Sequence, residues 1–424
     1  MLRRESGHQY SFRRGLLMTI AVGLLCLQGC VQVVQSDLTT PTHGAVPDLI
    51  RTLGPDQTFS NLPLHSVAQR VRASHSTEVL SILAMSAGGA DGAFGAGALV
   101  GLTRSGSRPQ FTIVTGVSAG ALLAPYAFLG SAWDSQLVDI YTTGRAEHLL
   151  QPRGFGALFG SSIYRGKPLK ELIDRYIADA LVQAVAREAA AGRLLLIVTT
   201  DVESGEPVVW DLGSIAMNGG SHARTLFRDV VMASASVPGM FPPVIIHVQE
   251  QNATIEEAHF DGTVSVPFFV PAGLAEMPKH RVLGGSNGAV VYVIINGRLS
   301  EERLSVPLKA KAILERSVSA GLNHMMRTTL ALTATNIELE GARLQYAAIP
   351  FGYPPAIPFD FRVQTTRRLF RYGYDCAMAG RLWISSQRLG DQANGRGVGA
   401  NQRIPCPVDD DNEFIAAVSR AETK

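Results

Sequence analysis

Short apolar stretches alternate with longer amphipathic ones through most of the chain. The runs VLSILAMS (79–86) and FTIVTG (111–116) are short, apolar and bounded by glycine, which predicts buried strands. Each run is followed by small apolar residues at helical spacing, over 92–106 and over 118–130. Such an alternation of strands and helices predicts an α/β fold with a largely parallel sheet covered by helices on both faces.

The alternation continues toward the C-terminus. We predict further helices at 135–143, 167–192, 223–236 and 308–340, two strands joined by a Ser-Gly turn at 193–212, and strands at 241–248 and 289–297. We therefore expect a catalytic core over 77–290, and a strand and helices over 291–424 that complete the same domain.

The first 29 residues resemble an export signal, because a basic segment precedes an apolar run too short to span a bilayer. The run ends in LQGC, which resembles the lipobox of bacterial lipoproteins and implies cleavage before Cys30 and lipid attachment to its sulfur. Val31 resembles the residue of the outer-membrane class, so we expect a lipoprotein at the outer membrane facing the periplasm. The alternative is an ordinary secretory signal with a chance cysteine. Residues 30–76, with four prolines, predict a lipidated tether with one short helix near 64–73.

Composition excludes one class of partner. The chain of 424 residues is 46% hydrophobic and 17% charged, with a formal net charge of +2, so we expect no nucleic-acid partner. Of four cysteines, Cys26 and Cys30 belong to the N-terminal segment. Cys376 and Cys406 remain as a candidate disulfide in a compartment that permits one, with two free buried thiols as the alternative.

A serine lies between two glycines at residues 116–120, GVSAG. The G-x-S-x-G pattern after an apolar strand and before a helix is typical of a tight turn that exposes a nucleophile, here Ser118. Gly116 and Gly120 have no Cβ atoms, so they let such a turn close. The alternative is a glycine-rich turn in which Ser118 only caps the helix.

A second glycine cluster, AGGADG (87–92), follows the strand at 79–86. The backbone amides of Gly88, Gly89 and Ala90 are candidates for an oxyanion hole. A dinucleotide site is excluded, because the G-x-G-x-x-G spacing and a later acidic partner are missing. We interpret Asp91 as a helix cap.

A catalytic serine needs a base. HFDGT (259–263) offers Asp261 at the end of a strand, although Asp-Gly is also a common hairpin signal. His259 lies on the same strand face as Asp261, and we interpret it as a structural histidine. The histidines that follow Ser118 do not lie in distinctive loops: His148, His222, His247, His259, His280 and His324. An α/β-hydrolase triad with one of them stays an alternative.

AGGADG, GVSAG and DGT, in this order and with ASASVPGMFPPV (233–244) before the third, resemble the patatin-like phospholipase family. The similarity covers about 80–265, and RRLFRYGYDCA (367–377) resembles the C-terminal helix of that family. The resemblance implies a three-layer α/β/α fold with a mainly parallel central sheet. It also implies a dyad of nucleophile Ser118 and general base Asp261, an oxyanion hole in the Gly88–Gly89 region, and no metal or organic cofactor.

The chain departs from the family pattern at three positions. Ala87 and Asp91 replace a glycine and a basic residue of G-G-G-x-[RK]-G, and Thr263 replaces a Gly or Ala. The lost positive charge weakens the case for a phosphate-bearing substrate. We expect a membrane-anchored acyl hydrolase acting on lipid or phospholipid esters. The alternatives are an esterase with a histidine-containing triad, and an inactive patatin-like lipoprotein that serves as an envelope scaffold or binding protein.

Overall fold

The structure is a computed structural model that describes residues 51–53, 80–154, 160–250, 253–271, 289–299, 306–350, 353, 359–386 and 406. Contacts divide the chain into two units, 1–44 and 45–424, and all the described residues lie in the second. The predicted signal, the lipidation site at Cys30 and the helix near 64–73 lie outside them. Within these ranges, no helix is both long and apolar enough to cross a membrane.

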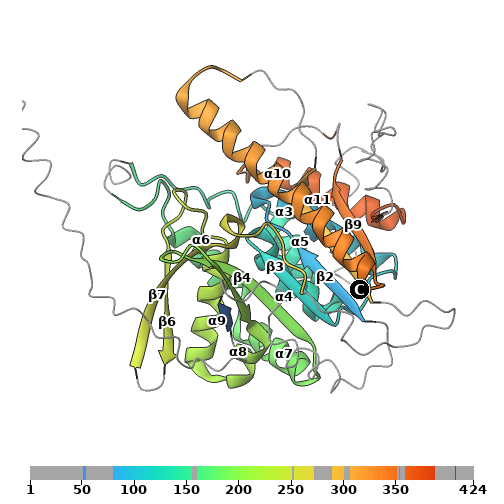
Figure 1. Ribbon diagram of the computed structural model, residues 1–424, viewed down its shortest axis with the longest axis horizontal. Helices are drawn as coiled ribbons and strands as arrows, with labels where there is room; N and C mark the ends of the chain where they lie inside the picture. The colour runs from blue at the N-terminus through green and yellow to red at the C-terminus, as the bar shows by residue number, and fades with distance from the viewer. Residues whose placement is uncertain are drawn as a thin grey trace, which may run out of the picture. The chain divides into compact units, whose positions relative to one another are not determined.

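A mixed sheet forms the centre of the described unit (Figure 1). Five neighbouring strands run parallel, in the order β4-β3-β2-β8-β9: β2 Ser81–Met85, β3 Ile113–Val117, β4 Leu194–Asp201, β8 Val290–Arg298 and β9 Arg343–Ile349. Antiparallel strands complete the sheet: β1 Arg51–Leu53, β5 Pro207–Asp211, β6 Val244–Glu250, β7 Ala253–Asp261 and β10 Ile384–Ser385. The predicted α/β fold with a mainly parallel sheet is confirmed.

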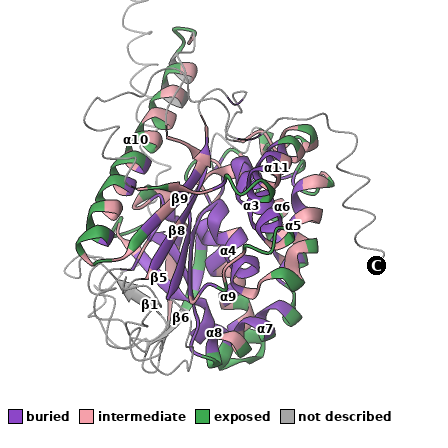
Figure 2. Ribbon diagram, turned by 90° about the vertical axis from the view of Figure 1, so that its right-hand side faces the viewer, coloured by how far each residue is buried: buried purple, intermediate pink, exposed green. Residues whose placement is uncertain are grey.

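Helices form the outer layers. One face of the sheet packs against α3 Gly92–Arg104, α4 Ala119–Leu129, α5 Asp134–Thr142, α6 Lys167–Tyr176, α7 Asp179–Ala190, α8 Leu212–Asn218, α9 Gly220–Ser234 and α11 Val363–Met378. The other face packs against α10 Ala310–Leu339 and residues 266–270. Figure 2 shows α10 alone on one side of the strands and α3, α4, α5 and α11 on the other.

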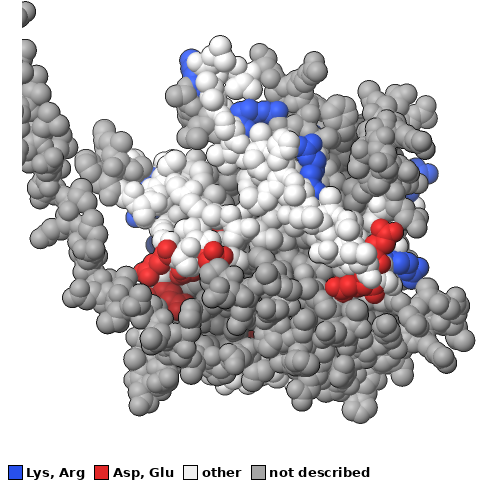
Figure 3. Space-filling model, in the orientation of Figure 1, with Lys and Arg blue, Asp and Glu red and all other residues white. Residues whose placement is uncertain are grey.

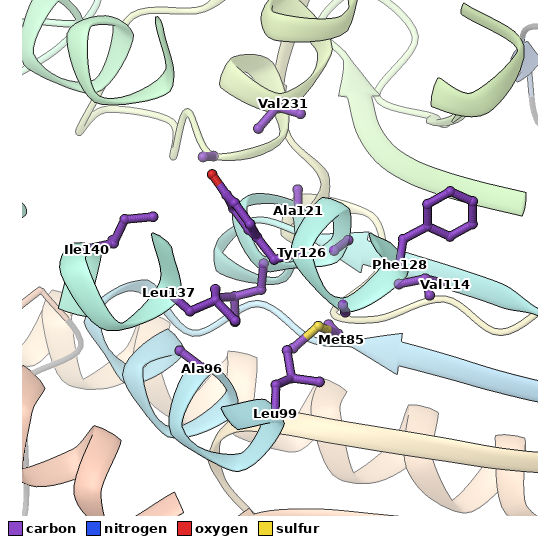
Figure 4. Packing of buried hydrophobic residues seen from close by; sticks show 14 of the residues in the cluster. Met85, Ala96, Leu99, Val114, Ala121, Tyr126, Phe128, Leu137, Ile140 and Val231 are labelled. Carbon is purple, nitrogen blue, oxygen red and sulfur yellow. The ribbon is translucent and has the colours of Figure 1, made fainter. Parts of the chain in front are cut away.

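The two faces follow from the alternation of side chains along each strand. In β2, Leu83 and Met85 belong to the core under α3 and α4, whereas Ile82 and Ala84 belong to the core under α10. Figure 4 shows Met85 beside Leu99 of α3, and both belong to the same core as Phe128 of α4. Because both faces are buried, these strands read as continuous apolar runs in the sequence.

One predicted helix needs correction, and two elements were not predicted. The helical stretch 167–192 is two helices, because the chain leaves the helical conformation at Ile177 and Ala178 between α6 and α7. Strand β9 was not predicted, because the apolar part of RLQYAAI is short and follows the polar residues Arg343 and Gln345. The short helix α8 was not predicted either.

Two other expectations concern the surface and the cysteines. Figure 3 shows charged side chains of both signs scattered among uncharged ones on the face of the described residues that carries α10.

Cys376 of α11 and Cys406 form a disulfide in the structure, with Cα atoms 5.1 Å apart. This bond joins α11 to a residue 30 positions later in the chain.

Candidate active site

Ser118 occupies a strained turn between β3 and α4. Its φ of 55° is the only positive φ found among the described non-glycine residues, a conformation that costs on the order of 1–3 kcal/mol and occurs preferentially at functional sites. A Cβ atom on Gly120 would lie 2.1 Å from the Met85 carbonyl oxygen, and one on Gly116 would lie 2.5 Å from the Gly120 carbonyl oxygen. Gly120 is therefore required because the turn packs directly against the end of β2, and Gly116 is required because the turn closes on itself.

The turn brings Ser118 to Asp261. The Ser118 hydroxyl donates a hydrogen bond of 2.6 Å to Oδ2 of Asp261, at the end of β7. Strand β7 pairs with β4, which pairs with β3, so the sheet joins two residues that are 143 positions apart. Both side chains are buried, with 5% of Ser118 and 1% of Asp261 exposed.

The second carboxylate oxygen of Asp261 is also held. Oδ1 accepts hydrogen bonds from the Thr263 amide, at 2.8 Å, and from the Thr263 hydroxyl, at 2.5 Å. These donors fix the carboxylate plane and leave Oδ2 to Ser118. Thr263, a departure from the family pattern, thus orients the predicted base.

Burial raises the pKa of Asp261 from 3.8 to about 6, against the hydrogen bonds from Ser118 and Thr263, which lower it. The raised pKa makes the carboxylate a stronger base by about 3 kcal/mol. The group is still ionised at neutral pH. Its position and basicity suit proton abstraction from Ser118.

The glycine-rich loop lies beside the serine turn, because β2 pairs directly with β3. The Asn296 side-chain amide donates to the Ser86 carbonyl at 2.8 Å, and the Asn296 backbone amide donates to the Ser86 hydroxyl at 2.9 Å, so β8 holds the loop. A Cβ atom on Gly88 would lie 1.8 Å from the Asn296 carbonyl oxygen, and Gly89 has a φ of 58°. Both positions therefore require glycine.

The amides of Gly88 and Gly89 donate no hydrogen bond to another described residue. Gly89 and Ser118 line the same cavity. Free backbone amides beside a nucleophile are what an oxyanion hole needs. The predicted role of this loop, including Ala90 in its 3₁₀ turn Gly89–Asp91, stays a prediction that this geometry supports.

The interpretation of Asp91 as a hydrogen-bonding helix cap is wrong. Asp91 stands at the N-terminal cap position of α3, but its side chain makes no capping hydrogen bond. Its φ of −68° and ψ of −8° are helical, because the preceding 3₁₀ turn runs straight into α3. A capping side chain needs an extended backbone to reach the free amides, so the Asp91 carboxyl cannot do so.

The histidines considered above as alternative bases are not hydrogen-bonded to Ser118 where the structure describes them. His259 is fully buried; its Nδ1 lies 3.1 Å from the Thr199 hydroxyl and its Nε2 lies 3.2 Å from Oε2 of Glu257. Among the described residues, no hydrogen bond joins a histidine to Ser118. His280 lies outside them. The Asp-Gly pair at 261–262 is not a hairpin turn, since it leads from β7 into a 3₁₀ turn over Gly262–Val264.

Sequence reasoning missed a supporting residue, Ser234 at the end of α9. Its hydroxyl accepts a hydrogen bond from the Ser118 amide at 3.0 Å and donates one to the Val198 carbonyl at 2.6 Å. Ser234 therefore ties the serine turn to β4. The motif ASASVPGMFPPV contains it, but nothing in the motif indicates which serine makes the contact.

An apolar cavity of about 60 Å³ opens at Ser118. Its walls come from α4, α5 and α6 together with residues 235–241 and 359–361, and include Leu122, Ile140, Leu169 and Phe361. Figure 4 shows Ile140 of α5 on the side of α4 from which Tyr126 projects. The lining suits an aliphatic chain attached to a group that reacts at Ser118.

No group of three or more His, Cys, Asp or Glu side chains suited to a metal ion occurs in the described part of the chain. The groups present around Ser118 are a carboxylate, hydroxyls and backbone amides. Together they can perform acyl transfer with one acid–base group.

Comparison with known proteins gives three findings. Residues 83–272 match the family model of patatin-like phospholipases. The search of curated proteins gives no match. Among solved structures the chain is similar to VipD from Legionella pneumophila, with a TM-score of 0.35 and 13% identity, over 82% of this chain and 74% of that one. It is also similar to human GIVD cytosolic phospholipase A2, with a TM-score of 0.31 and 11% identity, over 67% of this chain and 55% of that one.

The family match covers the serine turn, the glycine-rich loop and the end of β7. It supports a lipid esterase or phospholipase activity. Residues 83–272 of this chain form a domain of the patatin-like phospholipase family.

Proposed function

We propose that the protein is a serine acyl hydrolase that cleaves carboxylic esters of lipids with Ser118 as nucleophile and Asp261 as general base. The 2.6 Å hydrogen bond from the Ser118 hydroxyl to Asp261, at the mouth of an apolar cavity, is the observation that carries the proposal. In this arrangement the acyl chain occupies the cavity and the ester carbonyl lies over Ser118.

The reaction proceeds through an acyl-enzyme. Asp261 Oδ2 accepts the Ser118 proton as Oγ attacks the carbonyl carbon, and the resulting oxyanion accepts hydrogen bonds from the Gly88 and Gly89 amides. Asp261 then returns the proton to the leaving alcohol. A water molecule, deprotonated by the same carboxylate, attacks the acyl-enzyme; the bond to Ser118 Oγ breaks, Asp261 returns the proton to Oγ, and the acid is released.

The test measures hydrolysis by the full-length protein in detergent. We expect release of p-nitrophenol from p-nitrophenyl butyrate and of fatty acid from phosphatidylglycerol in mixed micelles, and the ratio of the two rates separates esterase from phospholipase preference. A fluorophosphonate should label Ser118, identified by peptide mass spectrometry. If neither substrate is cleaved and no label is found, the proposed function fails and the inactive scaffold becomes the better explanation. Cleavage with the label on another residue would exclude Ser118 as nucleophile.

We also propose that the protein is held at the cell envelope by a lipid on Cys30, as the LQGC sequence suggests. Expression in a bacterium with labelled palmitate should give a labelled protein in the outer-membrane fraction. Cys30→Ser should lose both the label and the membrane association, whereas Cys26→Ser should keep both. Label retained by the Cys30 variant would contradict the proposal.

A further inference from the structure

Asp91 is a buried carboxyl group that the proposed mechanism does not use. Asp91 is 8% exposed, and its Oδ1 is fully buried with no hydrogen-bond partner among the described residues. A buried polar atom without a partner costs about 1–3 kcal/mol, and more when it is charged. The position therefore disfavours the ionised carboxylate and calls for an explanation.

Asp91 stands next to the atoms that would stabilise the oxyanion. It ends the 3₁₀ turn Gly89–Asp91, its amide donates to the Gly88 carbonyl at 3.1 Å, and α3 begins at the next residue. The positive end of the α3 dipole and the loop amides both favour negative charge here. A carboxylate at Asp91 would oppose a second negative charge on the reacting ester.

Few charged groups face Asp91. The adjoining turns of α3 and α4 carry no charged side chain. From β8, the charge of Arg298 favours ionisation of Asp91, although Nη1 of Arg298 donates to the Tyr353 carbonyl at 2.8 Å. From α5, the Tyr141 hydroxyl lies 2.9 Å from where a Cβ atom on Gly92 would stand.

Helix α11 also packs against this turn and carries basic side chains that are engaged elsewhere. The Arg367 guanidinium donates to the Thr142 carbonyl, and Nε of Arg371 lies 3.5 Å from Asp375. Burial outweighs the charge of Arg298 and raises the pKa of Asp91 from 3.8 to about 7. The carboxyl therefore changes charge near neutral pH.

We propose that Asp91 controls the Ser118 site through the charge that it places beside the oxyanion loop, and that the protonated carboxyl is the form that supports ester hydrolysis. The proposal rests on the proposed function, because it assigns a charge-sensitive step to the same site. It predicts an enzyme that works in a narrow pH window. Asp261 must be ionised for activity, which sets the acid limit, and Asp91 must be protonated, which sets the alkaline limit.

The test compares kcat/KM for p-nitrophenyl butyrate between pH 4.5 and 9 in the wild type and in Asp91→Asn. The wild type should show a maximum between the two pKa values, about 6 for Asp261 and about 7 for Asp91. Asp91→Asn should keep the acid limb and lose the alkaline decline. At pH 8.5 it should exceed the wild type about tenfold, because Asp91→Asn removes a unit charge that opposes the negative charge on the reacting ester.

Asp211→Asn is the matched control. Asp211 is also 8% exposed and also stands at the N-terminal cap position of a helix, α8, but unlike Asp91 its oxygens accept hydrogen bonds from the Ser214 amide at 2.9 Å and the Ser214 hydroxyl at 2.8 Å. Its substitution should leave the shape of the pH profile unchanged. An alkaline limb that persists in Asp91→Asn, or that disappears in Asp211→Asn as well, would overturn the proposal.

Thermal unfolding gives a readout that does not depend on activity. A carboxyl whose pKa is higher in the folded than in the unfolded state destabilises the fold as pH rises between the two values, about 4 and 7 here. Asp91→Asn removes this destabilisation. The difference in melting temperature between the variant and the wild type should therefore grow from about pH 4 to about pH 7 and stay constant at higher pH. A difference that does not change with pH would contradict a protonated Asp91, and Asp91→Ser repeats the measurement should the Asn variant not fold.

The outcomes separate the two proposals. A wild-type protein that is inert at every pH and unlabelled by the fluorophosphonate refutes the proposed function, and with it a catalytic effect of Asp91. An active wild type whose alkaline limb does not respond to Asp91→Asn refutes only the role of Asp91.

Discussion

Ser118→Ala is expected to lower kcat for ester hydrolysis by about 10³-fold or more, and Asp261→Asn by about 10²–10⁴-fold, the usual contribution of a general base. Asn is the informative replacement because it can keep the local structure. Its amide oxygen can accept the two hydrogen bonds from Thr263, which leaves the NH₂ group facing the Ser118 hydroxyl. An amide cannot take the proton, so the loss reports on base catalysis.

The double variant distinguishes a dyad from two unrelated residues. If Asp261 acts only through Ser118, then Ser118→Ala combined with Asp261→Asn should be no slower than Ser118→Ala alone, since groups that act as a unit give strongly non-additive losses. Wild-type kcat/KM should rise with pH through about 6, as the raised pKa of Asp261 requires. An Asp261→Asn variant of normal activity, together with a histidine variant that is inactive, would favour the triad alternative.

The sequence could indicate the site because its chemistry depends on backbone shape. Gly88, Gly116 and Gly120 stand where a Cβ atom would collide with neighbouring backbone, so the glycines that mark the two motifs are physically required. The positions of the buried parallel strands along the chain also follow from local apolar runs, because such strands are buried on both faces of the sheet. Strand β9 is the exception.

What the sequence could not indicate depends on contacts between distant segments. The bond between Ser118 and Asp261 exists because β7 pairs with β4, and no local pattern predicts that pairing. Ser234 of α9 and Asn296 of β8 support the site through hydrogen bonds to residues that are distant in the sequence. Asp91 was misinterpreted because the residue type suits a cap, while its backbone conformation, set by the preceding turn, does not.

Helices α3 and α11 pack with their backbones in close contact. A Cβ atom on Gly97 would lie 1.8 Å from the Phe370 carbonyl oxygen, and one on Gly101 would lie 2.4 Å from that of Tyr374. From the other side, a Cβ atom on Gly373 would lie 2.2 Å from the Phe94 carbonyl oxygen. The contact thus needs glycine on both helices, and α3 also carries the glycine-rich loop at its N-terminus.

Gly97→Ala is therefore expected to destabilise the fold by about 3 kcal/mol or more, because α11 must move away from α3 to admit the methyl group. Gly321 is the matched control: it lies in the interior of α10, where a Cβ atom would meet no atom within 4 Å beyond the helix's own neighbouring turns. The same substitution there should stabilise the protein by about 0.5–1 kcal/mol, through the higher helix propensity of alanine. Midpoints of urea unfolding, measured side by side, should move in opposite directions. A Gly97→Ala variant as stable as the wild type would mean that the two helices do not pack as closely as the structure has them, and the position of the loop before α3 would then lack this support.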